Sequence, residues 1–209
     1  EWVSYIVVES GRYILEGDVV VEAGITRTTT IHSSGTGWGG VDVQFNKAFS
    51  STPAILHSLV THDNNDFMAS LVTDVETGSF KVGMEAAGSG KTSPGEDVGW
   101  IAFSPKTGST SSTSFVIGIG KDGTADGVSN ETPHVINMSG FGSTPDVVVS
   151  IFNPVGGDGS WARGAGIWTM NKQTVYAEED QVSDNERGHL DELFAWAAFL
   201  AETDLVATA

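Results

Sequence analysis

The chain has 209 residues, 39% of them hydrophobic, no cysteine and a formal net charge of −17. The absence of cysteine excludes disulfides, thiolate metal ligands and thiol nucleophiles, and the negative charge argues against nucleic acid or an anionic membrane surface as a partner. No apolar run approaches the ~20 residues of a membrane-spanning helix. We therefore expect a globular protein without membrane insertion.

The first eight residues carry a pattern that occurs twice more along the chain. Glu1–Val8, Glu96–Phe103 and Glu192–Phe199 each begin with an acid, have an aromatic residue four positions later and keep large side chains at alternate positions. This spacing predicts a strand with one apolar face. Because a free amphipathic strand is an aggregation hazard, we expect residues 1–8 to pair with a sheet edge, on the second half of the chain or on a neighbouring molecule. The side chains predicted to make this contact are Trp2, Tyr5, Ile6 and Val8.

Other segments repeat in the same order. Val19–Gly24 returns as Phe115–Gly120, displaced by 96 positions, and Phe49–Pro53 returns as Phe141–Pro145, displaced by 92 positions. A stretch rich in Ser, Thr and Gly, Lys106–Thr113, separates the two sets and is typical of a linker. Matching strand order with loops of different length indicates two homologous units.

The predicted fold is all-β, with two tandem homologous antiparallel β-sandwich domains related by pseudo-symmetry. An extra N-terminal strand and turn occupies residues 1–18, the first unit residues 19–108 and the second unit residues 109–209. Trp100 and Trp196 are expected at equivalent buried positions. No segment shows a sustained 3.6-residue period, so very little helix is expected.

Two loops of the first unit are candidates for ligand or subunit contact. One is glycine-rich and contains Trp38, which either contacts a sugar or neighbouring subunit or caps its own sandwich. The other is polar and resembles part of a calcium loop, but it lacks the glycine and the distant glutamate of the EF-hand pattern, which favours a plain turn. Its candidate residues are Asp63, Asn64, Asn65 and Asp66.

An acidic hairpin near the C-terminus offers weak candidates for a divalent cation. These are Glu178, Asp180, Asp184, His189 and Glu192. The corresponding loop of the first unit has no such cluster, and an acidic hairpin in a chain of this charge is more often solvated, so we predict neither a metal nor another cofactor. The histidines are scattered and no nucleophile elbow is present, so we expect no enzymatic activity.

The order of three segments resembles the H-type lectin-like β-sandwich. These segments are Val41–Pro53, Thr77–Val82 and Glu96–Ala102, and the likeness extends more loosely to the second unit. It implies compact antiparallel sandwiches that associate through sheet faces and bind sugars at subunit borders. The acidic, cysteine-free tandem also looks like the shell proteins that enclose the Rubisco-filled pyrenoid of diatoms, which implies self-assembly into sheets or tubes in the chloroplast stroma, at the pyrenoid periphery.

Two hypotheses about function follow. The favoured one is a non-enzymatic structural protein that forms a homo-oligomeric lattice of itself. The alternative is a carbohydrate-binding, lectin-like module of a secreted marine protein, with a glycan as its partner and an extracellular location.

Overall fold

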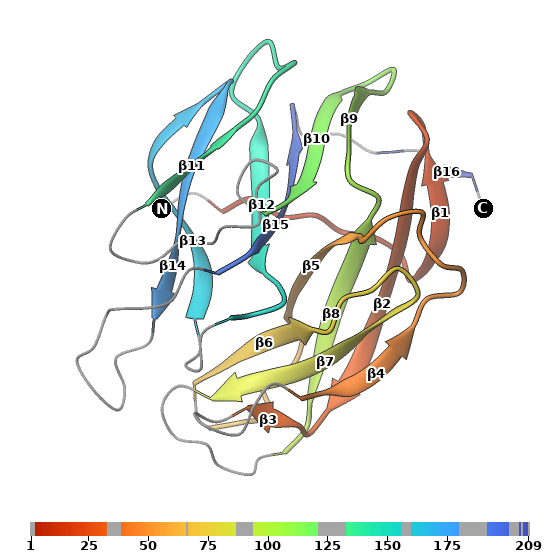
Figure 1. The fold of residues 1–209 in the computed structure, drawn as a ribbon, viewed down its shortest axis with the longest axis vertical. Helices are drawn as coiled ribbons and strands as arrows, with labels where there is room; N and C mark the ends of the chain where they lie inside the picture. Colours follow the sequence, from red (N-terminus) through yellow and green to blue (C-terminus); the bar gives the residue numbers. More distant parts are fainter. Residues whose placement is uncertain are drawn as a thin grey trace.

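The computed structural model of the protein describes residues 3–32, 39–65, 67–86, 94–120, 133–155, 160–179 and 192–200, together with 205, 207 and 208. Within these residues the chain forms sixteen β-strands and no helix, so the all-β prediction is confirmed (Figure 1). The part described accordingly holds no apolar helix able to cross a membrane. Six predicted contact or ligand residues lie outside the described residues: Trp2, Trp38, Asp66, Asp180, Asp184 and His189.

The strands form four sheets, which we number I to IV. In sheet I, β7 (Ser79–Ala86) pairs with β3 (Ile31–His32), β4 (Val41–Gln44) and β6 (Met68–Thr73). Sheet II has the order β16 (Ala207–Thr208), β1 (Gly11–Leu15), β2 (Val19–Thr28), β8 (Glu96–Phe103) and β5 (Ala54–Leu59). Sheet III has the order β12 (Asp146–Ile151), β15 (Phe194–Phe199), β10 (Ser114–Ile119) and β9 (Lys106–Ser109), and sheet IV the order β11 (His134–Asn137), β14 (Lys172–Glu179) and β13 (Ser160–Thr169). All pairs are antiparallel except β3 with β7.

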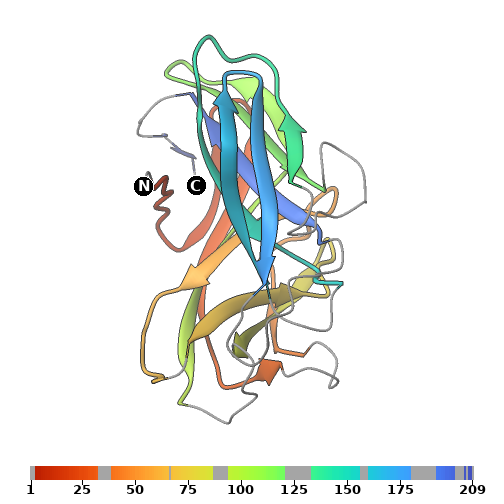
Figure 2. The ribbon, with the colours of Figure 1, turned by 90° about the vertical axis from the view of Figure 1, so that its left-hand side faces the viewer.

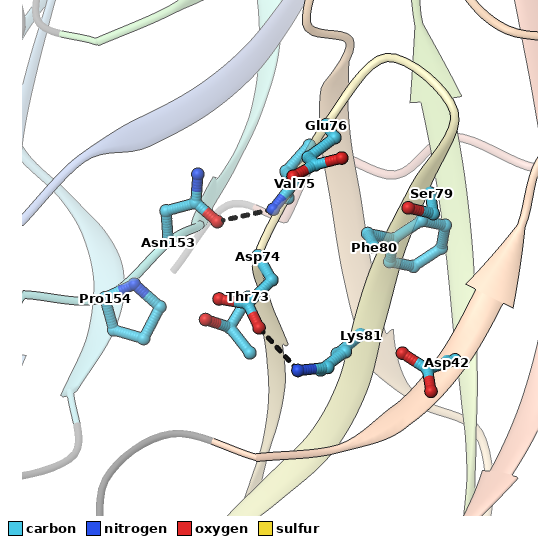
Figure 3. A pocket seen from close by; sticks show the side chains of 10 residues that line it. All are labelled: Asp42, Thr73, Asp74, Val75, Glu76, Ser79, Phe80, Lys81, Asn153 and Pro154. Carbon is cyan, nitrogen blue, oxygen red and sulfur yellow. Dashed lines mark hydrogen bonds and ion pairs between the residues drawn. The ribbon is translucent and has the colours of Figure 1, made fainter.

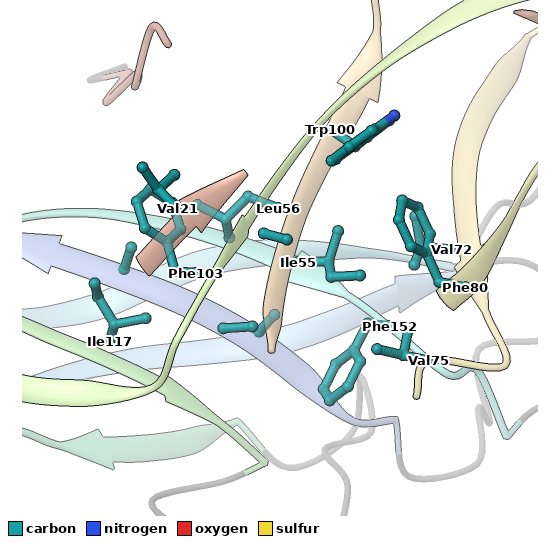
Figure 4. Packing of buried hydrophobic residues seen from close by; sticks show 14 of the residues in the cluster. Val21, Ile55, Leu56, Val72, Val75, Phe80, Trp100, Phe103, Ile117 and Phe152 are labelled. Atoms are coloured by element: carbon teal, nitrogen blue, oxygen red, sulfur yellow. The ribbon is translucent and has the colours of Figure 1, made fainter. Parts of the chain in front are cut away.

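Each of the two middle sheets, II and III, is covered by an outer sheet on one face, and over part of the other face the two sheets share a core. Every second residue of β15, beginning with Phe194, belongs to the core between sheets III and IV, and the alternate residues, beginning with Ala195, belong to the core shared with sheet II. This explains why all six residues of β15 are apolar and buried. One core therefore continues from the first half of the chain into the second, and Figure 4 shows Ile117 and Phe152 in the cluster that contains Phe103.

The strand order of sheet II, β1-β2-β8-β5, recurs in sheet III as β9-β10-β15-β12. The pairing also corrects our alignment of the repeats. Phe103 lies opposite Val21, and Phe199 lies opposite Phe115, so Phe115 corresponds to Val21 and not to Val19. A shift of two residues leaves every side chain on the same face of a strand, which is why the apolar pattern did not reveal it.

The predicted linker at Lys106–Thr113 is wrong in its first half. Residues Lys106–Ser109 are β9, an edge strand that pairs with β10. Its Thr, Gly and Ser residues have little to bury there, because most of β9 is exposed. Lys106 at its start suits an unpaired edge, since a lysine discourages pairing with another chain.

Each of the two core tryptophans lies opposite a glycine of the adjacent strand. Trp100 is paired with Gly24 and Trp196 with Gly118, and both indoles are buried. A Cβ atom at Gly24 would lie 2.6 Å from Cζ2 of Trp100, and one at Gly118 would collide in the same way with Trp196. The bare glycine backbone thus makes room for each indole ring.

The substitutions Gly24→Ala and Gly118→Ala are expected to destabilise the fold by about 1–3 kcal/mol each, because the added methyl group displaces a buried indole. Urea unfolding followed by tryptophan fluorescence measures the loss. Gly78→Ala is the matched control, since nothing lies within 4 Å of a Cβ at that position. Equal midpoints for all three variants would contradict this account.

Candidate functional site

The polar loop after β5 is folded around a buried carboxylate. Glu96, which is 1% exposed, accepts hydrogen bonds from Thr61 Oγ1 at 2.5 Å, from the backbone amides of Asp63 and Asn64 at 2.8 Å, and from Asn64 Nδ2 at 2.7 Å. Asn64 Nδ2 also donates to the carbonyl of Pro94. The side chain of Asn64 is therefore buried and used within the chain, so this residue is structural.

The neighbouring residues of this loop face outwards. Asp63 forms an ion pair of 3.0 Å with Arg27, which also contacts Asp97 at 3.1 Å. These pairs are largely exposed and contribute little stability. Asn65 is exposed. Of the predicted ligand loop, only the side chains of Asp63 and Asn65 therefore reach the surface among the described residues, and that of Asp63 already has a cationic partner.

Two of the weak metal candidates have partners within the chain. Glu192 is fully buried and accepts a hydrogen bond of 2.7 Å from the backbone amide of Val155. It precedes β15 as Glu96 begins β8, so the acid of the repeated pattern is a buried anchor for a loop in both halves. Glu178 forms an ion pair with Arg163. Among the described residues, no group of three His, Asp or Glu side chains is arranged to hold a metal ion.

The two halves of the chain meet at a seam held by polar contacts around His57. His57 Nε2 lies 2.7 Å from the carbonyl oxygen of Ile151, and Nδ1 lies 2.8 Å from Ser70 Oγ. Because a carbonyl only accepts, Nε2 carries the proton and Nδ1 accepts from the serine hydroxyl. The backbone amide of His57 also donates to Ser150 Oγ at 3.1 Å. Burial lowers the pKa of His57 to about 4, against the opposing effect of the bond to Ile151, so the ring is neutral near pH 7.

A hollow of about 690 Å³ lies at the end of this seam (Figure 3). Lys81 and Asp74 form an ion pair of 2.7 Å at its edge, and Asn153 Oδ1 accepts from the backbone amide of Val75 at 2.9 Å. Asp42 and Glu76 also line it. Its charged lining residues are therefore three carboxylates and one lysine that is already paired, and no histidine is among the residues that line it.

A second hollow, which we call the seam groove, has a volume of about 350 Å³. Its lining comes from β5, β6, β12 and β13 with their adjoining loops, one edge strand from each of the four sheets, and from Glu85 of β7. Figure 2 views the molecule from this side, with the blue β13–β14 hairpin above the orange and yellow strands of the first half. At its rim Phe67, 61% exposed, packs against Trp161 with 5.5 Å between ring centroids. This pair could not be predicted from the sequence, because the two rings are 94 positions apart and only the packing of the halves joins them.

The N-terminal segment is extended but is not part of a sheet within this chain. Residues 3–9 form no strand, and none of the backbone hydrogen bonds of the described residues involves them. Their side chains alternate: Ile6 and Val8 pack against the core, whereas Val3, Tyr5 and Val7 are 82%, 75% and 84% exposed. Pairing with an edge of the second half, one of our two predictions for residues 1–8, is not seen among the described residues. The only side-chain hydrogen bond from this segment to the described second half joins Ser4 Oγ to Asp146 Oδ1 at 3.2 Å.

Comparison with known proteins found no matching family model, no similar curated protein and no similar solved structure.

The substitution Glu96→Gln is expected to destabilise the protein by roughly 2–3 kcal/mol at pH 7, because an amide cannot accept all four of the hydrogen bonds made to the carboxylate.

Burial raises the pKa of Glu96, but the hydrogen bonds from Thr61, Asp63 and Asn64 outweigh this effect and lower the pKa to about 2. Stability from this lowered pKa is present above pH 4.5 and is lost as the pH falls towards 2. Urea titrations from pH 7 to pH 2.5 should show this loss in the wild type and a smaller one in the variant. The exposed Glu76→Gln is the control, and an equal effect there would refute the assignment.

The neutral, partly buried His57 predicts a second pH window. Its pKa of about 4 lies below the ordinary value of 6.5, so the unfolded chain binds a proton first as the pH falls. Stability is therefore lost between pH 6.5 and pH 4. Replacement by glutamine should flatten the stability curve in this window, measured by thermal unfolding, whereas replacement of the exposed His62 should not. Parallel curves for wild type and His57→Gln would show that the pKa of the ring is the same in the folded and the unfolded chain.

Proposed function

We propose that the protein is a non-enzymatic structural protein that self-assembles into a sheet or shell, and that its N-terminal segment makes the connecting contact. The observation that carries the proposal is the outer row, by which we mean Val3, Tyr5 and Val7. These side chains are 82%, 75% and 84% exposed on an extended segment whose backbone forms no hydrogen bond with the backbone of the other described residues. Large apolar side chains beside free backbone donors and acceptors are the features of a segment that adds to the sheet of another molecule.

We infer further that the chain is a tandem of two homologous sandwiches related by a pseudo-two-fold axis. The support is the shared strand order of sheets II and III and the matching glycine–tryptophan pairs. In addition, the corresponding edge strands β5 and β12 meet at the seam, where His57 contacts Ser150. Contact between corresponding elements is what a two-fold arrangement produces. A duplicated unit of this kind offers similar surfaces twice, which suits a lattice component.

The charge of the chain sets a condition on assembly. Copies that each carry a formal charge of −17 repel one another, and this repulsion falls as salt shortens the screening length to about 8 Å at 0.15 M. Assembly is therefore expected to need moderate ionic strength. The resemblance to pyrenoid shell proteins extends the proposal to the chloroplast stroma, with the assembled protein enclosing the Rubisco-filled pyrenoid.

The test replaces two residues of the outer row, Tyr5→Ser with Val7→Ser. We expect the critical concentration for assembly to rise roughly tenfold or more, since a loss of about 1.4 kcal/mol per contact corresponds to a factor of ten. The melting temperature of the isolated chain should change little, because both side chains are exposed. Negative-stain microscopy and sedimentation across a salt series provide the readouts.

The matched control is Ile25→Ser with Val60→Ser, which removes apolar side chains that are 60% and 56% exposed elsewhere on the surface. It should assemble like the wild type. A wild-type protein that stays monodisperse at every salt concentration contradicts the proposal, and binding to a glycan array by that protein would establish the carbohydrate-binding alternative.

A further inference from the structure

The seam groove exposes unpaired strand edges beside apolar side chains. Strand β6 pairs with β7 alone and β13 pairs with β14 alone, so each has one edge free of a neighbouring strand within the described residues. Phe67 and Trp161 stand at the rim, and Val155, next to Pro154 of the lining, is 58% exposed. An exposed apolar hollow bordered by free edges is an acceptor for an added strand.

The same chain carries a segment of the complementary kind. The outer row presents large apolar side chains at every second position, and its backbone has no backbone partner in the part of the chain that the structure describes. Its own molecule does not use it to fill the groove, because no residue of 3–9 lines that hollow and the inner side chains Ile6 and Val8 pack elsewhere. Residues 1–8 also share the pattern of β8, which in this fold pairs with β5, one of the strands of the groove.

We propose that the seam groove of one molecule takes residues 3–7 of a second copy of this chain as an added strand, with the outer row lying against Phe67 and Trp161. This inference rests on the proposed self-assembly and specifies its acceptor. Donor and acceptor are different surfaces of the same molecule, so the contact is head-to-tail. A head-to-tail contact closes into a ring only if the rotations between successive molecules lead back to the first molecule. Otherwise it continues from molecule to molecule and builds an extended assembly.

The contact is of moderate size. An aromatic side chain buries ~150–250 Å² when it is fully covered, so three outer-row residues and the rim provide several hundred Å² in total. This is less than the ~1,200 Å² of a stable two-body interface. The added strand therefore serves as one of several weak contacts whose effect accumulates in a lattice, where each neighbour raises the local concentration of the next.

The absence of cysteine allows a direct test by cross-linking. Two single-cysteine variants of the full chain, Tyr5→Cys and Phe67→Cys, are mixed in equal amounts under assembling salt and treated with a short bismaleimide. Cross-linked dimer on a denaturing gel should exceed that of the control mixture, Tyr5→Cys with Ile25→Cys, roughly tenfold, because only the groove holds the donor at high local concentration. Val3→Cys and Val7→Cys repeat the measurement in case position 5 does not tolerate the change.

The outcomes separate this inference from the function on which it rests. Assembled protein with no excess of links from positions 3, 5 or 7 to position 67 overturns the acceptor but leaves self-assembly standing. If the wild-type chain never assembles, the proposed function itself is wrong. The double variant Tyr5→Cys with Phe67→Cys is treated in the same way, as dilute, unassembled protein. A link within one chain would show that the segment fills its own groove, and it would overturn the role of a second copy.

Discussion

The core that sheets II and III share is the constraint on which the rest of this structure depends. A strand covered on one side can alternate apolar and polar residues, but a strand between two other sheets must be apolar throughout, as β15 is. Because the middle layers come from different halves of the chain, the core between them unites residues such as Phe103 and Ile117. The halves consequently form one packed body, and their relative position is set by side-chain packing rather than by a linker.

Two buried carboxylates accept hydrogen bonds from loop backbone amides that would otherwise have no partner within the chain. Glu96 and Glu192 stand at the same place in the repeated pattern, and each anchors the loop that follows the neighbouring edge strand, β5 in one half and β12 in the other. An ionised group in such a position is stable only when its oxygens are fully hydrogen-bonded. In these two copies, the acid that opens the pattern is thus part of the folded core and holds a loop in place.

Two surface features take no part in packing the core, and our proposal for the function rests on them. The outer row and the seam groove are apolar, exposed and bordered by free backbone, and they lie on separate parts of the molecule. Neither is needed to close the core of the chain. In our proposal, copies of the chain associate through these two surfaces once salt has screened their negative charge.

The sequence by itself determined the strands and their faces, because side-chain alternation and turn residues act locally. It predicted the buried tryptophans at positions 100 and 196 and the all-β class. Pattern alone could not detect the two-residue shift between β2 and β10, since such a shift preserves the faces, nor distinguish the exposed edge strand β9 from a linker. Only the tertiary structure decided that residues 3–9 stay unpaired and that Phe67 meets Trp161, because both depend on how sheets distant in sequence stack against each other.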